Sequence, residues 1–217
     1  MDLTLARFNM VQQQVRPWDV SDKRVLDLLS TIPREQFLPK ALHALAYSDT
    51  LLPIGCNQVA LSPKIAARIL QAVNPNAQNS ILEIGTGTGY LTALLAQLAK
   101  KVTSIEIIPD LKNQAQKNLD FLGIHNVSLE LGDGSNGWAT GAPYDIIVIT
   151  GTLPIIPVSF RNQISNHGRL FAFVGKPPVI KAVLLTRIKQ DHFQEKVLFE
   201  TLIPPLINGS KLTQFQF

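Results

Sequence analysis

The sequence contains very little cysteine and no cluster of metal-binding side chains. Cys56 is the only cysteine among the 217 residues, so an intrachain disulfide is excluded. The four histidines are scattered, and no group of Cys and His has the spacing that a structural zinc site needs. We therefore expect a cytoplasmic protein that holds no metal.

Long apolar runs and export signals are also missing. The densest apolar run, residues 91–98, is far shorter than the ~20 residues that cross a bilayer. The first twenty residues contain neither an apolar stretch of signal-peptide length nor a small-residue cleavage site. We therefore expect no export and no membrane partner.

Charge is sparse and spread evenly. Charged residues make up 17% of the chain, the net charge is +4, and no block of like charge occurs. The stretch from Arg161 onward is the most basic, but it lacks the interleaved aromatic residues of an RNA-binding face. We expect a solvated surface there and no nucleic-acid partner, while the oligomeric state stays open.

What the sequence does contain fits one folded domain. Hydrophobic residues make up 46% of the chain, which is enough for a sizeable core. We expect a single domain over residues 1–217. It divides into an N-terminal helical and loop segment over 1–75 and a cofactor-binding α/β core with an antiparallel end over 76–217.

The N-terminal segment shows helical spacing with clear breaks. Residues 3–29 predict two helices broken at Arg16-Pro17, the second capped by Asp22 or Ser21. Prolines interrupt residues 33–55, which predicts a short helix and loops. A further helix is expected to open at Ser62-Pro63, because proline suits the first helical position.

The core alternates strands with helices. Strands are predicted over 80–84, 101–106, 127–131 and 144–150, with helices over 90–98 and 111–122. Such alternation indicates a parallel sheet with right-handed crossovers. Three later strands are predicted to pair in antiparallel fashion, over residues 169–174, 179–188 and 193–202.

A turn rich in glycine follows the first strand of the core. Gly85, Gly87 and Gly89 would let the backbone pass close to a ligand and turn amide N–H groups toward it. Glu106 ends the next strand, where a carboxylate can accept both hydroxyls of a ribose. Together they indicate a nucleoside site, although a purely structural turn and a solvated acid are the alternatives.

Tyr90 decides which nucleoside cofactor is expected. The dinucleotide fingerprint requires glycine at that position, because a pyrophosphate must lie on the helix N-terminus. S-adenosylmethionine has no pyrophosphate. Asp133, in Gly132-Asp133-Gly134, could accept a hydrogen bond from the adenine amino group, or it could be an Asx-turn residue. The predicted cofactor-binding residues are Glu83, Gly85, Thr86, Gly87, Gly89, Glu106, Asp133 and Gly134.

Further segments carry a resemblance to a known family. They include Ile32-Pro33-Arg34-Glu35-Gln36-Phe37, residues 47–55, residues 82–90, Gly137-Trp138, Pro143-Tyr144-Asp145 and Gly168-Arg169-Leu170. The chain resembles the protein-L-isoaspartate O-methyltransferases from about Arg24 to its end. The resemblance implies an α/β, doubly wound Rossmann-like sheet that is mostly parallel, with one antiparallel strand near the C-terminal end and a helical segment before it.

The resemblance also implies an activity. The free α-carboxylate of an isoaspartyl residue in a damaged protein or peptide takes the methyl group of S-adenosylmethionine, which leaves S-adenosylhomocysteine. The ester then collapses to a succinimide that can reopen as normal aspartate. Because the carboxylate has a pKa near ~3.5, alignment matters more than a general base. The implied substrate-binding residues are Asp49, Ile54, Gly55 and Gln58.

One position departs from the family pattern. Where the family reads Gln-Thr-Ile-Ser-x-Pro, this chain has Gln58-Val59-Ala60-Leu61-Ser62-Pro63, so Leu61 fills the position of the active-site serine. Leu61 and Ser62 are therefore the candidate catalytic positions. Three hypotheses stay open: an isoaspartyl methyltransferase, a methyltransferase of the same fold for another acceptor, and a cofactor-binding protein without transferase activity.

Overall fold

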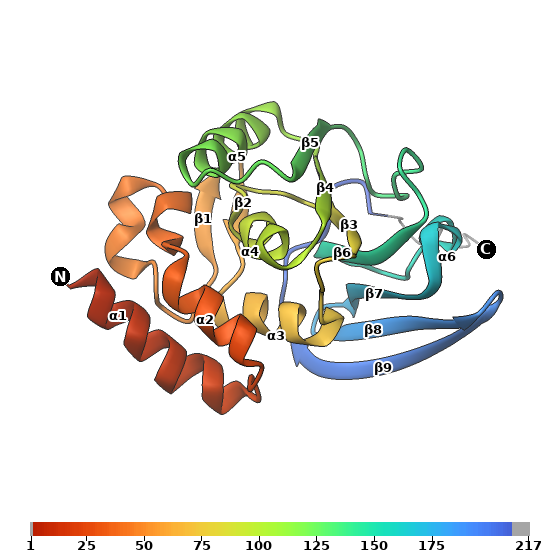
Figure 1. Cartoon of the computed structure of the whole chain (residues 1–217), viewed down its shortest axis with the longest axis horizontal. Helices are drawn as coiled ribbons and strands as arrows, with labels where there is room; N and C mark the ends of the chain where they lie inside the picture. The colour runs from red at the N-terminus through yellow and green to blue at the C-terminus, as the bar shows by residue number, and fades with distance from the viewer. Residues whose placement is uncertain (1, 210–217) are drawn as a thin grey trace.

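A computed structural model describes residues 2–209 of the chain (Figure 1). Its centre is a seven-stranded sheet of order β5-β4-β3-β6-β7-β8-β9, in which β8 runs antiparallel to both neighbours and the other pairings are parallel. The doubly wound, mostly parallel sheet with one antiparallel strand is thus confirmed. The strands are β3 (Ser80–Ile84), β4 (Lys101–Glu106), β5 (Val127–Leu131), β6 (Tyr144–Leu153), β7 (Ile164–Lys176), β8 (Val179–Lys189) and β9 (His192–Thr201).

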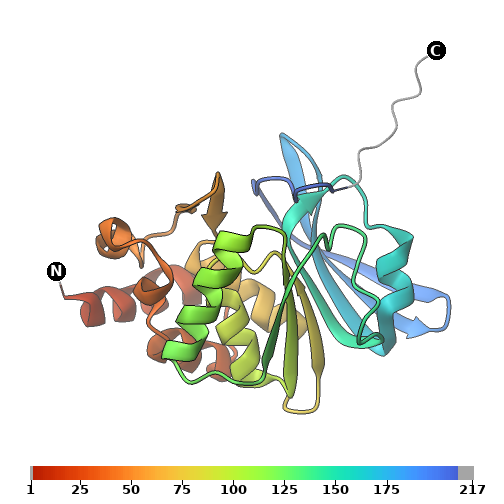
Figure 2. The same cartoon turned by 90° about the horizontal axis from the view of Figure 1, so that it is seen from above.

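Successive residues of the strands pack alternately into two separate hydrophobic cores, one on each face of the sheet. Ile146 and Val148 of β6 belong to one core, whereas Ile147 and Ile149 belong to the other. This follows from the period of two along a strand that is buried on both faces. Figure 2 shows α3, α4 and α5 on one side of the sheet and α6 on the other. The helices are α3 (Pro63–Val73), α4 (Tyr90–Leu98), α5 (Pro109–Phe121) and α6 (Val158–Gln163).

The order of the strands creates a crevice beside β3. The chain leaves β3 through α4 to β4 on one side, whereas β6 lies on the opposite side of β3. Crossovers therefore diverge at the carboxyl end of β3, where open α/β sheets bind ligands. The glycine turn between β3 and α4 lies at this switch point.

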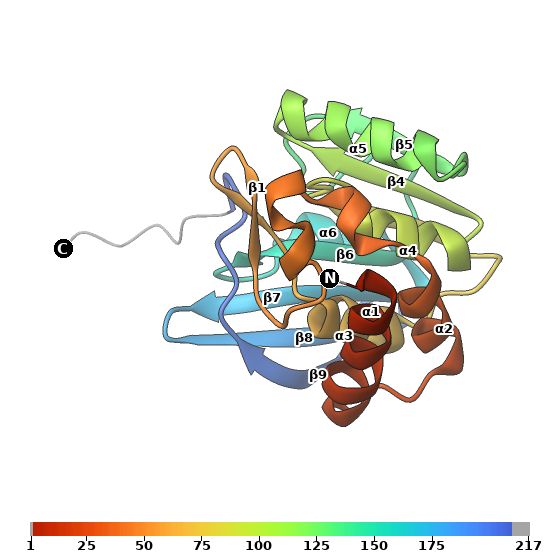
Figure 3. The ribbon, with the colours of Figure 1, turned by 90° about the vertical axis from the view of Figure 1, so that its left-hand side faces the viewer.

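The N-terminal segment packs on the side of the sheet that α3, α4 and α5 cover (Figure 3). It contains α1 (Leu3–Met10), a π-helical turn (Val11–Val15), a 3-10 turn (Arg16–Trp18) and α2 (Lys23–Thr31). The break between the two helices lies just after the predicted Arg16-Pro17, since these residues are part of the 3-10 turn and the chain leaves the helical conformation at Asp19, with a φ of 56°. Asp22 caps α2 by accepting the N–H of Arg24 at 2.9 Å. Of the two predicted caps, it is Asp22 that bonds to the helix.

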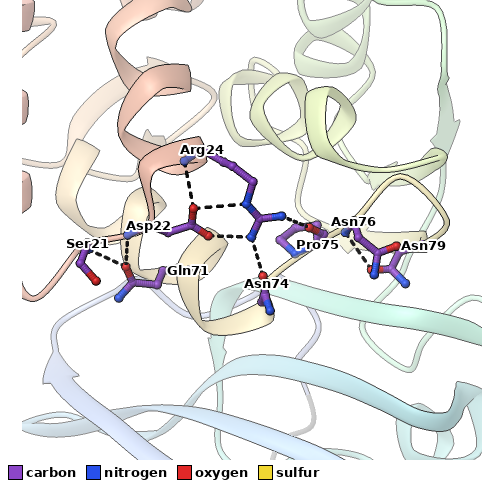
Figure 4. Close-up of polar contacts among 8 residues, drawn as sticks. All are labelled: Ser21, Asp22, Arg24, Gln71, Asn74, Pro75, Asn76 and Asn79. Carbon is purple, nitrogen blue, oxygen red and sulfur yellow. Dashed lines mark hydrogen bonds and ion pairs between the residues drawn. The ribbon is translucent and has the colours of Figure 1, made fainter.

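A polar network fastens α2 to the end of α3 (Figure 4). The Arg24 guanidinium donates to Pro75 O at 2.9 Å and to Asn74 Oδ1 at 2.5 Å. Gln71 Oε1 accepts the backbone N–H groups of Ser21 and Asp22 at 2.7 and 3.0 Å. These contacts hold the N-terminal helices against the segment that leads into β3.

The prediction of loops between residues 33 and 55 was partly wrong. Two 3-10 helices occur (Arg34–Phe37 and Lys40–Leu45), but a two-stranded hairpin follows, formed by β1 (Leu52–Gly55) and β2 (Gln58–Ala60). Cys56 and Asn57 connect the strands with φ of 51° and 57°. Such consecutive positive φ values suit a tight hairpin turn. Pro53 suggested a loop because proline cannot donate to a ladder, yet β1 pairs with a single partner, where proline is tolerated.

The other boundaries differ from prediction by up to three residues, except that β7 begins at Ile164, five residues before the predicted start at 169. β6 extends three residues beyond the predicted strand, to Leu153, and α6 was not predicted because its six residues are too few for a periodic pattern. The longest described helix, α5, has 13 residues. None of the helices within residues 2–209 is long and apolar enough to cross a membrane.

Candidate functional site

A pocket of about 1010 Å³, open mouth included, lies at the carboxyl ends of β3, β4 and β6. Its floor comes from Ile84, Ile105 and Thr150, near the ends of these strands. The turn 85–88 lines the pocket, and so do residues 58–61, which we call the acceptor loop because the family resemblance predicts that they contact the methyl acceptor. The pocket thus combines the predicted cofactor turn with the loop that carries the departure from the family pattern.

The glycine turn has a shape that side chains would block. Gly85 has a φ of +92°, and a Cβ built on it would lie 2.2 Å from Thr150 Oγ1. That hydroxyl donates to the carbonyl oxygens of Ile84 and Gly85, both at 2.9 Å. Thr150 therefore holds the start of the turn, a role that no sequence pattern indicated.

Gly87, in the turn after β3, lies close to the hairpin β1–β2. Its φ is +57°, and a Cβ added there would lie 3.1 Å from Ile54 Cδ1 of β1. Both residues line the pocket. A side chain at position 87 would crowd Ile54, so the hydrogen at this position lets the turn and the hairpin approach closely.

Glu106 lies on the pocket wall at the end of β4. Its two carboxylate oxygens accept backbone N–H groups, Oε2 from Gly87 at 2.8 Å and Oε1 from Ile108 at 3.0 Å. Burial raises the pKa of this carboxyl, while the N–H groups of Ile108 and Gly87 counteract the rise. Each carboxylate oxygen can accept more than one hydrogen bond, so the arrangement leaves capacity for ribose hydroxyls.

Glu83 lies beneath the turn and does not line the pocket. It is 0% exposed, and its Oε2 accepts hydrogen bonds from the hydroxyls of Thr92 and Ser104. Burial raises the pKa of Glu83 to about 7, and the negative charge of Glu106 adds to the rise. The side chain ties β3, β4 and α4 together below the site.

Gly89 is likewise off the pocket wall, whereas Thr86 lines it. Gly89 is the N-cap of α4, with a φ of +92°, and a Cβ there would lie 3.3 Å from Ala115 Cβ of α5. This glycine therefore permits close packing of two helices. Of the eight predicted cofactor residues, six line the pocket, and Glu83 and Gly89 support it from behind.

Asp133 forms the Asx turn that was one of its two predicted roles, while its contact with adenine stays a prediction. It lines the pocket, and its Oδ1 accepts the N–H of Ser135 at 2.9 Å, which forms an Asx turn and lowers the pKa of the carboxyl. Its Oδ2 accepts Asn208 Nδ2 at 3.0 Å. Gly134 also lines the pocket, and a Cβ there would lie 2.8 Å from Ile84 Cδ1.

The segment after β9 covers part of the pocket, which the sequence did not predict. Residues 203–207 line it. Thr152 holds this segment, since its N–H donates to Pro204 O and its carbonyl accepts the N–H of Leu206, both at 2.9 Å. The only sequence feature that indicated this packing is the apolar run with two prolines after the last strand, because apolar side chains are unfavourable in a solvated tail.

The acceptor loop brings apolar side chains to the pocket. Val59, Ala60 and Leu61 all line it, as does Gln58. The Leu61 carbonyl accepts a hydrogen bond from Arg34 Nη2 at 2.8 Å. Arg34 was seen in the sequence only as part of a family motif, and nothing in its spacing indicated this contact.

The remaining predicted acceptor residues divide between the wall and its surroundings. Ile54 lines the pocket, whereas Asp49, Gly55 and Ser62 do not. Asp49 is exposed and pairs with Lys64 Nζ at 2.5 Å. Ser62 is 3% exposed, and its hydroxyl oxygen has no hydrogen-bond partner within residues 2–209.

The polar groups of the site belong to a binding pocket without a metal cluster. Over residues 2–209, no group of three or more His, Cys, Asp or Glu side chains could hold a metal ion. Two carboxylates line the pocket instead, that of Glu106 beside the turn and that of Asp133 after β5, where the sequence predicts contacts to a nucleoside. Apolar residues such as Ile84, Ile105 and Leu111 also line the pocket, as in sites for small organic ligands.

Comparisons with known proteins agree on one group of relatives. Residues 7–211 match the sequence model of the family described as Protein-L-isoaspartate(D-aspartate) O-methyltransferase. The protein-L-isoaspartate O-methyltransferase of Syntrophus aciditrophicus is 42% identical over 185 residues, which cover 85% of this chain and 85% of that protein. Protein-L-isoaspartate O-methyltransferase 2 of Marinobacter nauticus is 38% identical over 207 residues, which cover 95% of this chain and 94% of that protein.

Solved structures show the same fold. A structure named protein-L-isoaspartate O-methyltransferase matches with a TM-score of 0.79 and 25% identity, over 92% of this chain and 65% of that one. A structure of the same family name from Plasmodium falciparum, in complex with S-adenosyl-L-homocysteine, matches with a TM-score of 0.77 and 16% identity, over 91% of this chain and 96% of that one. The predicted Rossmann-like methyltransferase fold is confirmed.

Proposed function

This chain belongs to the protein-L-isoaspartate(D-aspartate) O-methyltransferase family, and we propose that it methylates the α-carboxylate of isoaspartyl residues in damaged proteins or peptides. One observation carries the proposal: a single pocket joins the nucleoside-binding turn to the acceptor loop. Gly87 and Ile54 face each other at the junction, where methyl donor and acceptor would meet.

S-adenosylmethionine fits the donor end of the pocket. Glu106 would accept hydrogen bonds from the ribose hydroxyls, and Asp133 would accept one from the adenine amino group. The turn 85–88 would approach the amino-acid part of the cofactor. The close approach of Ile84 to Gly134 leaves no room for a side chain at 134, so this wall can lie flat against a ring. When bound, the cofactor supplies an electrophilic methyl carbon, which bonds to the acceptor oxygen while the carbon–sulfur electron pair stays on sulfur.

The residues of the chain need not remove a proton for this reaction. An α-carboxylate is already ionised at neutral pH, so the site must align it and keep water away. Leu61 and the covering residues 203–207 supply apolar surface at that end. The subsequent closure of the ester to a succinimide, with loss of methanol, needs only the peptide nitrogen of the substrate itself.

The apolar acceptor loop favours a second candidate. Val59 and Leu61 occupy positions where the family pattern has hydroxyl side chains, and both line the pocket. A less polar acceptor would suit such a wall, because an unpaired polar group in apolar surroundings is costly. A methyltransferase of the same fold for another acceptor is therefore the alternative.

A methyl-transfer assay separates these candidates. Radiolabelled S-adenosylmethionine is incubated with the enzyme and either an isoaspartyl peptide or the same sequence with normal aspartate. We expect base-labile methyl ester only on the isoaspartyl peptide. Calorimetry with S-adenosylhomocysteine serves as the control for an intact donor site. Cofactor binding without ester on the isoaspartyl peptide would reject the proposal and favour the alternative acceptor.

A further inference from the structure

Arg34 is a fully buried cation whose neighbours are main-chain carbonyls. Its side chain is 0% exposed, and within residues 2–209 no carboxylate forms an ion pair with it. Nη1 donates to Ala46 O and Nη2 donates to Leu61 O, while Nε has no partner in the same part of the chain. Burying a charge without a counterion costs free energy, so we expect Arg34 to contribute to function.

Arg34 lies directly behind the acceptor end of the pocket. Leu61, which takes the hydrogen bond from Nη2, lines the pocket. Tyr90 lines it too, and the guanidinium carbon lies 5.7 Å from the centre of the Tyr90 ring. Ala46, the other acceptor, precedes residues 47–51, which lead into the hairpin β1–β2. A single cation thus contacts three segments that surround the proposed acceptor site.

The contact with Leu61 also changes the peptide group that follows. A carbonyl that accepts from a cation is polarised, and its polarisation strengthens the N–H of the same peptide, here that of Ser62, as a donor. The guanidinium keeps its charge despite burial, because arginine does not deprotonate in proteins. In a low-dielectric interior this charge acts over more than one residue.

We infer that Arg34 is a positioning residue that makes the acceptor end of the pocket selective for a carboxylate. It holds the Leu61 carbonyl and places positive charge behind the acceptor loop, which has no charged side chain of its own. The inference rests on the proposed function, since it explains how an apolar loop accepts an anion. The carboxylate loses its negative charge as it takes the methyl group, so Arg34 should favour binding of the acceptor more than the transfer step.

Two substitutions separate the charge of Arg34 from its hydrogen bonds. Arg34→Lys keeps the charge, and Arg34→Gln keeps a donor but removes the charge. The probe is a pair of peptides, one with the isoaspartyl α-carboxylate and one with the corresponding primary amide. Their dissociation constants are measured in the presence of S-adenosylhomocysteine, together with kcat and KM for methyl transfer to the first peptide.

Wild type should bind the carboxylate peptide at least tenfold more tightly than the amide. Arg34→Gln should lower this ratio about tenfold and raise KM by a similar factor, with kcat changed less than threefold, while Arg34→Lys keeps the ratio within threefold. Affinity for S-adenosylhomocysteine should stay unchanged in both. If Arg34→Gln does not fold, Arg34→Met replaces it. Arg24→Gln is the matched control, because Arg24 also bridges two segments through oxygen acceptors, outside the pocket.

Three results would overturn the inference in different ways. If Arg34→Lys and Arg34→Gln lower the preference for the carboxylate peptide equally, the hydrogen bonds of Arg34 matter and its charge does not. An unchanged ratio in Arg34→Gln would exclude any role in acceptor selection. A wild type that binds S-adenosylhomocysteine but neither binds nor methylates the carboxylate peptide would reject the proposed function, and the inference with it.

Discussion

The carboxylate of Glu106 accepts a hydrogen bond from the backbone N–H of Gly87, with the two atoms 2.8 Å apart. The bond joins the end of β4 to the turn that follows β3, so the predicted ribose acceptor also shapes the predicted cofactor turn. This double role affects how a substitution at Glu106 must be tested, because lost affinity could come from either one.

Glu106→Ala should weaken binding of S-adenosylhomocysteine at least tenfold. Each ribose hydrogen bond to a charged acceptor contributes ~1.5–3 kcal/mol. To separate recognition of the ribose from the shape of the turn, calorimetry is repeated with the 2′-deoxy analogue of the ligand. Wild type should prefer the natural ligand, and Glu106→Ala should lose that preference. Glu130→Ala, on exposed β5 surface, should bind like wild type; a preserved preference in Glu106→Ala would refute the ribose role.

Gly85→Ala should damage the site more than Gly55→Ala. The two glycines have nearly the same φ, +92° and +93°, but a Cβ at Gly85 meets Thr150 Oγ1 at 2.2 Å, whereas a Cβ at Gly55 meets nothing within 4 Å. Both substitutions incur the left-handed backbone cost of ~1–2 kcal/mol. Only Gly85→Ala should also displace Thr150 and lower cofactor affinity at least tenfold. Urea denaturation and calorimetry measure the two effects, and equal effects at both positions would contradict the role of Thr150.

Glu83 should make the folded chain less stable as the pH rises from about 4.5 to about 7. Burial raises its folded pKa to about 7, from the ordinary value of 4.5 for a glutamate side chain. Within this window the unfolded chain has lost the proton and the folded chain still holds it, so stability falls with increasing pH. The difference between the folded and unfolded pKa corresponds to ~3 kcal/mol of stability, because one pKa unit is worth about 1.36 kcal/mol.

The measurement is the free energy of unfolding by urea at several pH values, for wild type and Glu83→Gln. The Gln side chain does not titrate, so the difference between the two proteins should change by up to ~3 kcal/mol across the window and stay constant above pH 8. Parallel pH profiles would show that Glu83 has no raised pKa in the folded chain.

Local patterns predicted the parts of the fold that depend on local spacing. The strands 80–84, 101–106 and 127–131 and the helix 90–98 have the predicted bounds, because each has a clear apolar pattern and a glycine adjoins three of the four. The hairpin β1–β2 was missed because its strands have only four and three residues. Strands that short are too brief for alternation to be recognised.

The site was predictable only where one segment supplies the whole signal. The glycine turn and Glu106 were found in this way, and both reach the pocket. The contacts Thr150 to Gly85, Arg34 to Leu61 and Asn208 to Asp133 each join residues far apart in sequence. No spacing rule connects such pairs, since it is the strand order and the path of the chain after β9 that bring them together.

Leu61→Ser should raise methyl transfer to an isoaspartyl peptide. Leu61 lines the pocket, and its carbonyl stays bonded to Arg34 whatever side chain it carries, so the loop should keep its place. A hydroxyl that donates to the charged acceptor in the transition state is worth ~1.5–3 kcal/mol, which corresponds to a gain of about tenfold to a hundredfold in kcat/KM. Cofactor affinity, measured by calorimetry, should not change.

Val59→Thr combined with Leu61→Ser makes the test stronger, because it restores both hydroxyls of the family pattern. Leu61→Ala is the matched control: it removes the same bulk without adding a donor, so a gain shared by Ala and Ser would be due to space alone. If another acceptor is the natural one, Leu61→Ser leaves isoaspartyl activity absent and places an unpaired hydroxyl in an apolar wall. Wild type and double variant that both bind cofactor and both fail to methylate the peptide would end the repair assignment, because the loop side chains could then no longer explain the lack of activity.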